Sequence, residues 1–180
     1  MKKTIRKWEL IGIAVISCVG ALLHFAFEWS GDLPPIGVFA AVNESVFEHL
    51  KLTYWPALLW AAIEYRFLRE HVNNFIIAKT AGLYVMPSVI IALFYAYTTI
   101  TGTESLIADI VIFVVAIALG QLTSYKILTK EGLSQNVHRP AIAGLVSLGA
   151  IYAVFTFYPP HVPFFMDPIS GTYGIGTHMH

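Results

Sequence analysis

The sequence has few charged residues for its length. Only 12% of its 180 residues are Asp, Glu, Lys or Arg, and 57% are hydrophobic, whereas a soluble domain carries about 25% charged residues. This deficit excludes an ordinary soluble globular domain and is typical of a polytopic membrane protein. The formal net charge is zero, so nothing in the composition indicates a nucleic-acid partner.

The chain also lacks the cysteines and the motifs that mark several common protein classes. Its single cysteine, Cys18, cannot form an intramolecular disulfide, and its apolar surroundings predict a small buried hydrophobic side chain. There is no Walker, Rossmann, GxSxG or HExxH motif and no internal repeat. The connections between its apolar runs leave no room for a soluble domain.

Five segments have the length and the apolar character of membrane-spanning helices, which need about 20 mostly apolar residues. We therefore predict an all-α, polytopic helix bundle that forms a single transmembrane domain over residues 1–180. The second segment is the least apolar, because it begins with NESVFEHLK. The start, MKKTIRK, leads into an apolar run without a small-residue cleavage site, so we expect a retained first helix. The predicted spans cover residues 8–27, 44–65, 78–99, 105–125 and 140–157.

The basic residues predict the orientation of these spans. With five spans, the residues before the first, between the second and third, and between the fourth and fifth all lie on one side. With Lys79, at the very start of the third span, counted in the second group, these three groups contain all of the 11 basic residues except Lys51. By the positive-inside rule, we expect a cytoplasmic N-terminus and a C-terminus outside.

The stretch NESVFEH at the start of the second span concentrates polar side chains beside hydrocarbon, where they should be paired, hydrated or functional. Asn43 is expected to cap the helix, with Glu44 in its first turn. Glu44 and Glu48 are four residues apart and His49 is adjacent, so these three side chains can converge on one surface.

Two other parts of the chain bring the same residue types to the predicted outer face. His24 and Glu28 are four residues apart at the end of the first span, and this spacing stacks them on one helix face. His161 and Asp167 follow the fifth span in a segment stiffened by four prolines. The sequence therefore predicts that three separate segments deliver histidine and carboxylate groups to one depth.

Histidine and carboxylate ligands at one depth predict a divalent metal site, with zinc first and iron or manganese as alternatives. A metal-bound water is acidified toward neutral pH, and a spare carboxylate can act as general base. The predicted function is a metal-dependent hydrolase acting on a membrane lipid or a lipid-linked substrate. The predicted ligands are His49 and His161 with Glu44 or Asp167, and His24 as a further candidate; the predicted bases are Glu48 and Glu28.

Other roles for the same residues stay open, including whether the chain is an enzyme at all. Glu48 can pair with Lys51 three residues later, and His49 can be a neutral, hydrogen-bonded histidine. A transporter or proton-coupled carrier would use these groups as a relay, and a non-catalytic protein would hold them in a structural polar network. Protein partners, including a homo-oligomer, are left open. The last histidines, His178 and His180, lie at the extreme terminus, where disorder is expected.

Three segments carry a resemblance to a known family: HFAFEWSG, AVNESVFEHLKLTYWPALLWAAIEY and FTFYPPHVPFFMDPISGTYGI. On these motifs, the chain is identified as a member of a domain-of-unknown-function family of small multi-pass membrane proteins from bacteria and archaea. The resemblance covers essentially the whole chain. It implies an all-helical fold in a prokaryotic plasma membrane and brings no activity. A looser similarity, to the ceramidase and adiponectin-receptor group of membrane metal hydrolases, is one of concept, since those typically have seven spans and a paired-histidine motif.

Overall fold

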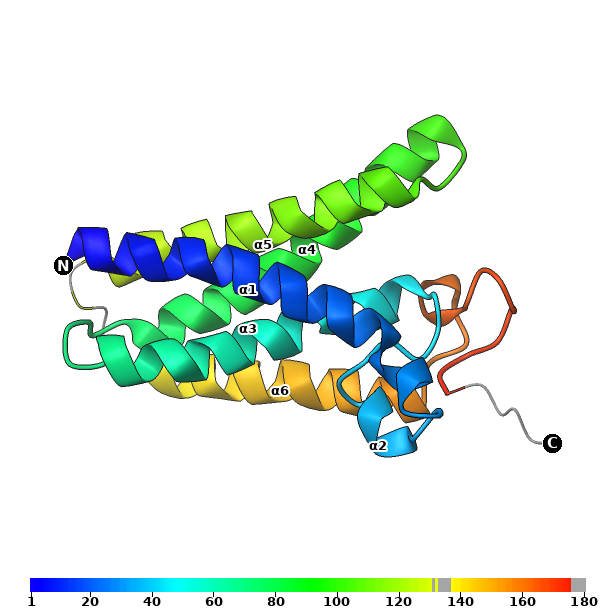
Figure 1. Cartoon of the computed structure of the whole chain (residues 1–180), viewed down its shortest axis with the longest axis horizontal. Coiled ribbons are helices and arrows are strands. Elements are labelled where there is room, and N and C mark those ends of the chain that lie inside the picture. The colour runs from blue at the N-terminus through cyan, green and yellow to red at the C-terminus, as the bar shows by residue number, and fades with distance from the viewer. Residues whose placement is uncertain (131, 133–136, 176–180) are drawn as a thin grey trace.

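The computed structural model describes residues 1–130, 132 and 137–175, and there the chain is built from helices (Figure 1). This confirms the predicted all-α fold. The expectation of disorder at His178 and His180 concerns residues outside those that the structure describes. The helices are α1 (Lys2–Trp29), α2 (Pro34–Gly37), α3 (Val46–Leu68), α4 (Phe75–Thr101), α5 (Leu106–Leu128) and α6 (His138–Phe157), followed by the 3-10 helix η2 (Pro163–Phe165).

Four of these helices, α1, α4, α5 and α6, are long and apolar enough to cross a membrane. Large apolar side chains remain exposed on them, among them Ile100, Ile107 and Val146, as contact with lipid requires. Cys18 of α1 is exposed as well, so the prediction that its side chain is buried is wrong. Helix α3 has 23 residues, as many as α5, but it carries more charge. The four apolar helices support the assignment of the chain as a membrane protein. The five-span count and the orientation of the termini stay predictions.

Helix α3 is the central helix and packs against α1, α4 and α6. Its buried residues run from Phe47 to Leu68 and include three charged side chains. In the core, the Tyr54 ring lies 5.2 Å, centroid to centroid, from the Tyr152 ring of α6, and its hydroxyl donates a hydrogen bond to the Leu145 carbonyl at 2.8 Å. Because these three charged side chains are themselves buried, they face protein groups and not lipid.

The connection between α1 and α3 and the C-terminal segment lie at the end of the bundle opposite the N-terminus (Figure 1). There the Phe165 ring of η2 lies 4.6 Å, centroid to centroid, from the Phe47 ring of α3. The Asn43 side chain donates a hydrogen bond to the Gly174 carbonyl at 2.9 Å. We call this end the loop end, and the end where α1 starts and α3 and α5 finish the N-terminal end.

Glycines allow the helix backbones to approach closely, as is common in membrane bundles. A Cβ atom on Gly20 of α1 would lie 2.4 Å from the Leu52 carbonyl oxygen of α3 and 2.7 Å from the Phe113 ring of α5. A Cβ atom on Gly82 of α4 would lie 2.9 Å from the Gly120 carbonyl oxygen of α5. These contacts fix how α1, α3, α4 and α5 are rotated against one another.

Replacing Gly20 with alanine is expected to lower the free energy of unfolding by about 1–3 kcal/mol, because the new methyl group meets a backbone oxygen that cannot move aside. Gly144→Ala is the matched control, since its Cβ atom would lie 3.5 Å from the Tyr84 ring, an ordinary contact. Alanine also favours a helix over glycine by about 1 kcal/mol. Thermal unfolding in detergent measures both variants, and equal midpoints would contradict the close-packing argument.

Candidate metal centre

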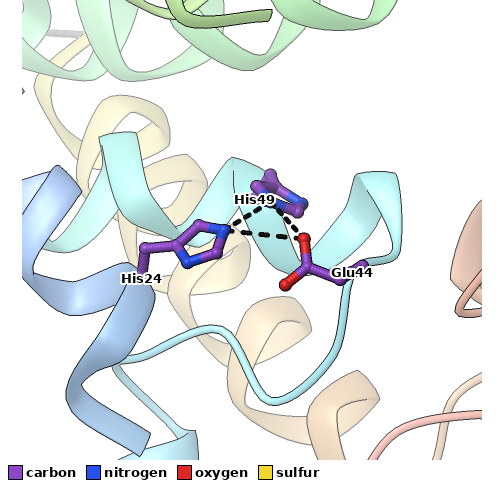
Figure 2. A group of neighbouring side chains, drawn as sticks. All are labelled: His24, Glu44 and His49. Atoms are coloured by element: carbon purple, nitrogen blue, oxygen red, sulfur yellow. Dashed lines mark hydrogen bonds and ion pairs between the residues drawn. The ribbon is translucent and has the colours of Figure 1, made fainter. Parts of the chain in front are cut away.

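Helix α1 and the start of α3 bring three of the predicted site residues together at the loop end. His24 lies in the last two turns of α1, Glu44 in the connection just before α3, and His49 in the first turn of α3. One ligand atom from each residue lies within 4.8 Å of the other two. Figure 2 shows the two imidazole rings and the carboxylate turned toward one another.

The chain turns sharply before α3, and this turn sets the position of Glu44. Asn43 Oδ1 accepts a hydrogen bond from the Ser45 N–H at 2.9 Å, and Ser45 Oγ accepts one from the Glu48 N–H at 3.4 Å. Ser45, whose backbone is extended, is therefore the N-cap of α3. The prediction that Asn43 caps the helix, with Glu44 in its first turn, is wrong because the Asn43 side chain closes the preceding turn instead.

The distances within the group are close to those of a metal ligand set. His24 Nε2 lies 3.1 Å from His49 Nε2, and Glu44 Oε2 lies 3.6 Å from the first atom and 3.5 Å from the second. Metal–ligand bonds of about 2.0–2.1 Å separate neighbouring ligand atoms by about 3.3 Å in tetrahedral and about 2.9 Å in octahedral coordination. The three side chains therefore need little movement to hold one ion.

Local contacts determine the tautomer of the His49 ring and keep the Glu44 carboxyl ionised. His49 Nδ1 lies 2.9 Å from the Ser45 carbonyl oxygen, which only accepts, so Nδ1 carries the proton. Nε2 of the neutral ring then has a lone pair that can accept a hydrogen bond from His24 or bind a metal. Such an outer contact orients a histidine ligand and fixes its tautomer. The neighbouring imidazole rings, of His24 first and then of His49, hold the pKa of the Glu44 carboxyl well below its ordinary value. Glu44 therefore contributes a full negative charge at neutral pH.

All three side chains are partly open to their surroundings. Those of His24, His49 and Glu44 are 29%, 32% and 44% exposed. Three protein ligands leave at least one position on a divalent ion, and the exposure leaves room for water or substrate there. Structural zinc sites use four protein ligands, whereas catalytic zinc sites use three and a water, so the group has the form of an open site.

Glu48 faces a different environment from His49, although the two are adjacent in sequence. Its buried carboxylate pairs with Lys51 Nζ at 2.5 Å. Lys51 Nζ also donates hydrogen bonds to the Gly37 carbonyl and the Thr156 hydroxyl, both at 2.7 Å. The structure thus shows the pairing that the spacing of Glu48 and Lys51 left open. The pairing also explains why Lys51 is the basic residue that the positive-inside rule does not account for. A catalytic role for Glu48 stays a prediction.

The structure places the other predicted site residues outside the three-residue group. Glu28 is exposed in the last turn of α1. His161 is exposed, and its ring lies 4.6 Å, centroid to centroid, from the Tyr173 ring. Asp167 is buried, and its carboxylate accepts a hydrogen bond from the Ser170 hydroxyl at 2.6 Å. The two C-terminal residues therefore contact their own segment, and their roles as ligands stay predictions.

A second cluster of charged residues, at the N-terminal end, was missed by the sequence analysis. The orientation rule counts Lys79 among the cytoplasmic basic residues, the sequence around Glu64 predicts a charge at the membrane interface beside Arg66 and Arg69, and Glu9 received no role. The structure buries Glu9, Glu64 and Lys79 against one another. A carboxylate at the start of an apolar run, Glu9, was the available sign, but its partners lie far away in the sequence.

Comparison with known proteins places the chain in a family. The model of the Family of unknown function (DUF6512) matches residues 1–175. No curated protein and no solved structure matches the chain significantly. The match confirms the family resemblance that the sequence motifs indicated, and it covers all three residues of the candidate metal centre. The chain therefore belongs to DUF6512, a family whose function is unknown.

Proposed function

We propose that this protein is a metal-dependent hydrolase of the membrane in which His24, Glu44 and His49 hold a divalent ion, with zinc first and iron or manganese as alternatives. The observation that carries the proposal is the convergence of two imidazole nitrogens and one carboxylate oxygen within 4.8 Å. Two histidines and one carboxylate form a known ligand set of catalytic zinc sites. His161 and Asp167 are left out of the proposed set, because their side chains contact the C-terminal segment.

The chemistry proposed for this centre is hydrolysis. A divalent metal lowers the pKa of a bound water toward neutral pH, which makes hydroxide available as a nucleophile. Glu28 lies four residues after His24 on α1 and is exposed, so we propose it as the base that accepts the proton. Glu48 is less suited to this step, because its carboxylate is already paired with Lys51. Helix α1, which carries His24, is apolar enough to span a membrane, and this favours a lipid or lipid-linked substrate.

Metal content tests the proposal directly. The protein is purified in detergent without nickel resin, incubated with zinc, iron or manganese, and analysed by mass spectrometry for bound metal. We expect about one ion per chain in the wild type and almost none in His49→Ala, because a ligand is lost. His161→Ala is the matched control and is expected to keep the ion. No metal in the wild type would exclude the metal centre, and loss in both variants would return His161 to the ligand set.

The hydrolase proposal has its own test once metal is bound. Zinc-loaded protein is incubated with bilayer lipids, and the products are followed by mass spectrometry. Glu28→Gln is expected to keep the ion and to lose hydrolysis, whereas a base in another position would leave this variant active. If no product forms with any lipid class, the result would favour a proton-coupled carrier or a non-catalytic protein. In the non-catalytic case, His49→Ala would lower stability and have no other effect.

A further inference from the structure

The N-terminal end of the bundle contains a buried cluster of charged groups that the proposed metal centre does not use. Glu9 of α1, Glu64 of α3 and Lys79 of α4 are 3%, 0% and 5% exposed. Lys79 Nζ donates to Glu9 Oε1 at 2.8 Å and also pairs with Glu64 Oε2. Two residues of α5 join them: the Ser124 hydroxyl donates to Glu9 Oε1 at 2.8 Å, and the Gln121 amide donates to the Glu9 carbonyl at 3.3 Å.

The charges in this cluster do not balance. Two carboxylates face one ammonium group, so the cluster has one excess negative charge when all three residues are ionised. The groups that face it from α5, Gln121 and Ser124, are neutral. An uncompensated charge buried away from water is very unfavourable. The cluster therefore requires one further positive charge.

Polar atoms in the cluster also lack partners. Within the part of the chain that the structure describes, Glu9 Oε2, Glu64 Oε1 and Trp60 Nε1 are buried without a hydrogen-bond partner. Trp60 and Glu64 are four residues apart on α3 and so share a helix face. A Cβ atom on Gly12 would lie 2.5 Å from Trp60 Nε1 and 2.1 Å from Gln121 Nε2, so this glycine makes room for both donors one turn from Glu9.

We propose that this cluster is a proton-binding site that holds one proton at neutral pH, on Glu64. A proton balances the charge and converts one carboxylate oxygen into a donor. Glu9 Oε1 already accepts hydrogen bonds from Lys79 and Ser124, whereas Glu64 has Lys79 as its one ionic partner among the described residues. The charge on Glu64 is therefore the less compensated of the two.

The surrounding groups favour a proton over a metal cation. Hard cations such as sodium or calcium need several oxygen ligands. Here the Lys79 ammonium group and the Ser124 hydroxyl donate to a carboxylate, and the Trp60 indole and Gln121 amide nearby are donors as well. Donors repel a metal ion. The site is also independent of the metal centre, because Glu64 follows His49 by 15 residues of α3, a rise of about 22 Å.

Infrared spectroscopy of the purified full-length protein tests the proposal. At neutral pH the wild type is expected to show one protonated-carboxyl stretching band that shifts in D2O. Glu64→Gln should remove this band, because glutamine cannot hold the proton. Glu70→Gln is the matched control, since Glu70 is exposed and pairs with Arg69, and it should leave the band unchanged.

The same variants give a second readout that does not depend on the spectrum. Glutamine has the shape and neutral charge of protonated glutamate, so Glu64→Gln should unfold at the wild-type temperature at neutral pH. A large loss of stability in this variant would overturn the proposal, because it would mean that the native state needs the charged form. A wild type without the band would overturn it as well. So would a wild type that is stable in a sodium buffer and loses stability when choline replaces the sodium, because a bound sodium ion would then supply the missing charge.

Discussion

Replacing Lys51 with methionine is expected to lower the free energy of unfolding by about 3–5 kcal/mol, because the change leaves the buried Glu48 carboxylate without its counter-ion. Lys51 Nζ is fully buried and contacts Glu48, the Gly37 carbonyl and the Thr156 hydroxyl. These contacts tie the connection after α1, helix α3 and helix α6 together at the loop end. Unfolding of detergent-solubilised protein, followed by temperature or denaturant, measures the loss.

Two controls separate the ion pair from a general effect of losing a lysine. Lys126→Met removes an exposed lysine at the end of α5 and should change stability by less than about 0.5 kcal/mol. The double variant Glu48→Gln with Lys51→Met removes both charges and should be more stable than Lys51→Met alone. If Lys51→Met matches Lys126→Met, the Glu48–Lys51 pair does not support the fold.

Glu44→Gln is expected to weaken metal binding by more than about 100-fold, a larger loss than a typical outer-shell change produces. Glutamine keeps the shape of the side chain but removes the negative charge that the two histidines hold in place. The fold should persist, because the Glu44 side chain is 44% exposed and lies outside the helices. Titration of metal-stripped protein with zinc, followed by calorimetry, measures the affinity.

Glu28→Gln is the matched comparison for that titration. It makes the same chemical change in an exposed glutamate of α1 that lies outside the three-residue group. We expect it to bind zinc as the wild type does. The reverse result, with strong loss in Glu28→Gln and none in Glu44→Gln, would mean that the ion sits on the α1 face formed by His24 and Glu28.

The sequence by itself determined the helical architecture, because the length of an apolar run is a local property. The segment predicted at residues 105–125 is α5 (Leu106–Leu128), and the one at 140–157 is α6 (His138–Phe157). Charge inside apolar sequence is also a local property, and it indicated NESVFEH and His24 as candidates. The family motifs added the membership that the match over residues 1–175 confirms.

Only the tertiary structure decided which of these polar residues meet. Adjacent residues on a helix point about 100° apart, so His49 turns toward His24 and Glu44 while Glu48 turns inward to Lys51. The cluster of Glu9, Glu64 and Lys79 draws on three helices far apart in sequence. Such partnerships depend on how each helix is rotated and at what depth it sits. Those two quantities are set by packing, through close backbone contacts such as the one at Gly20, and no local property of the sequence encodes them.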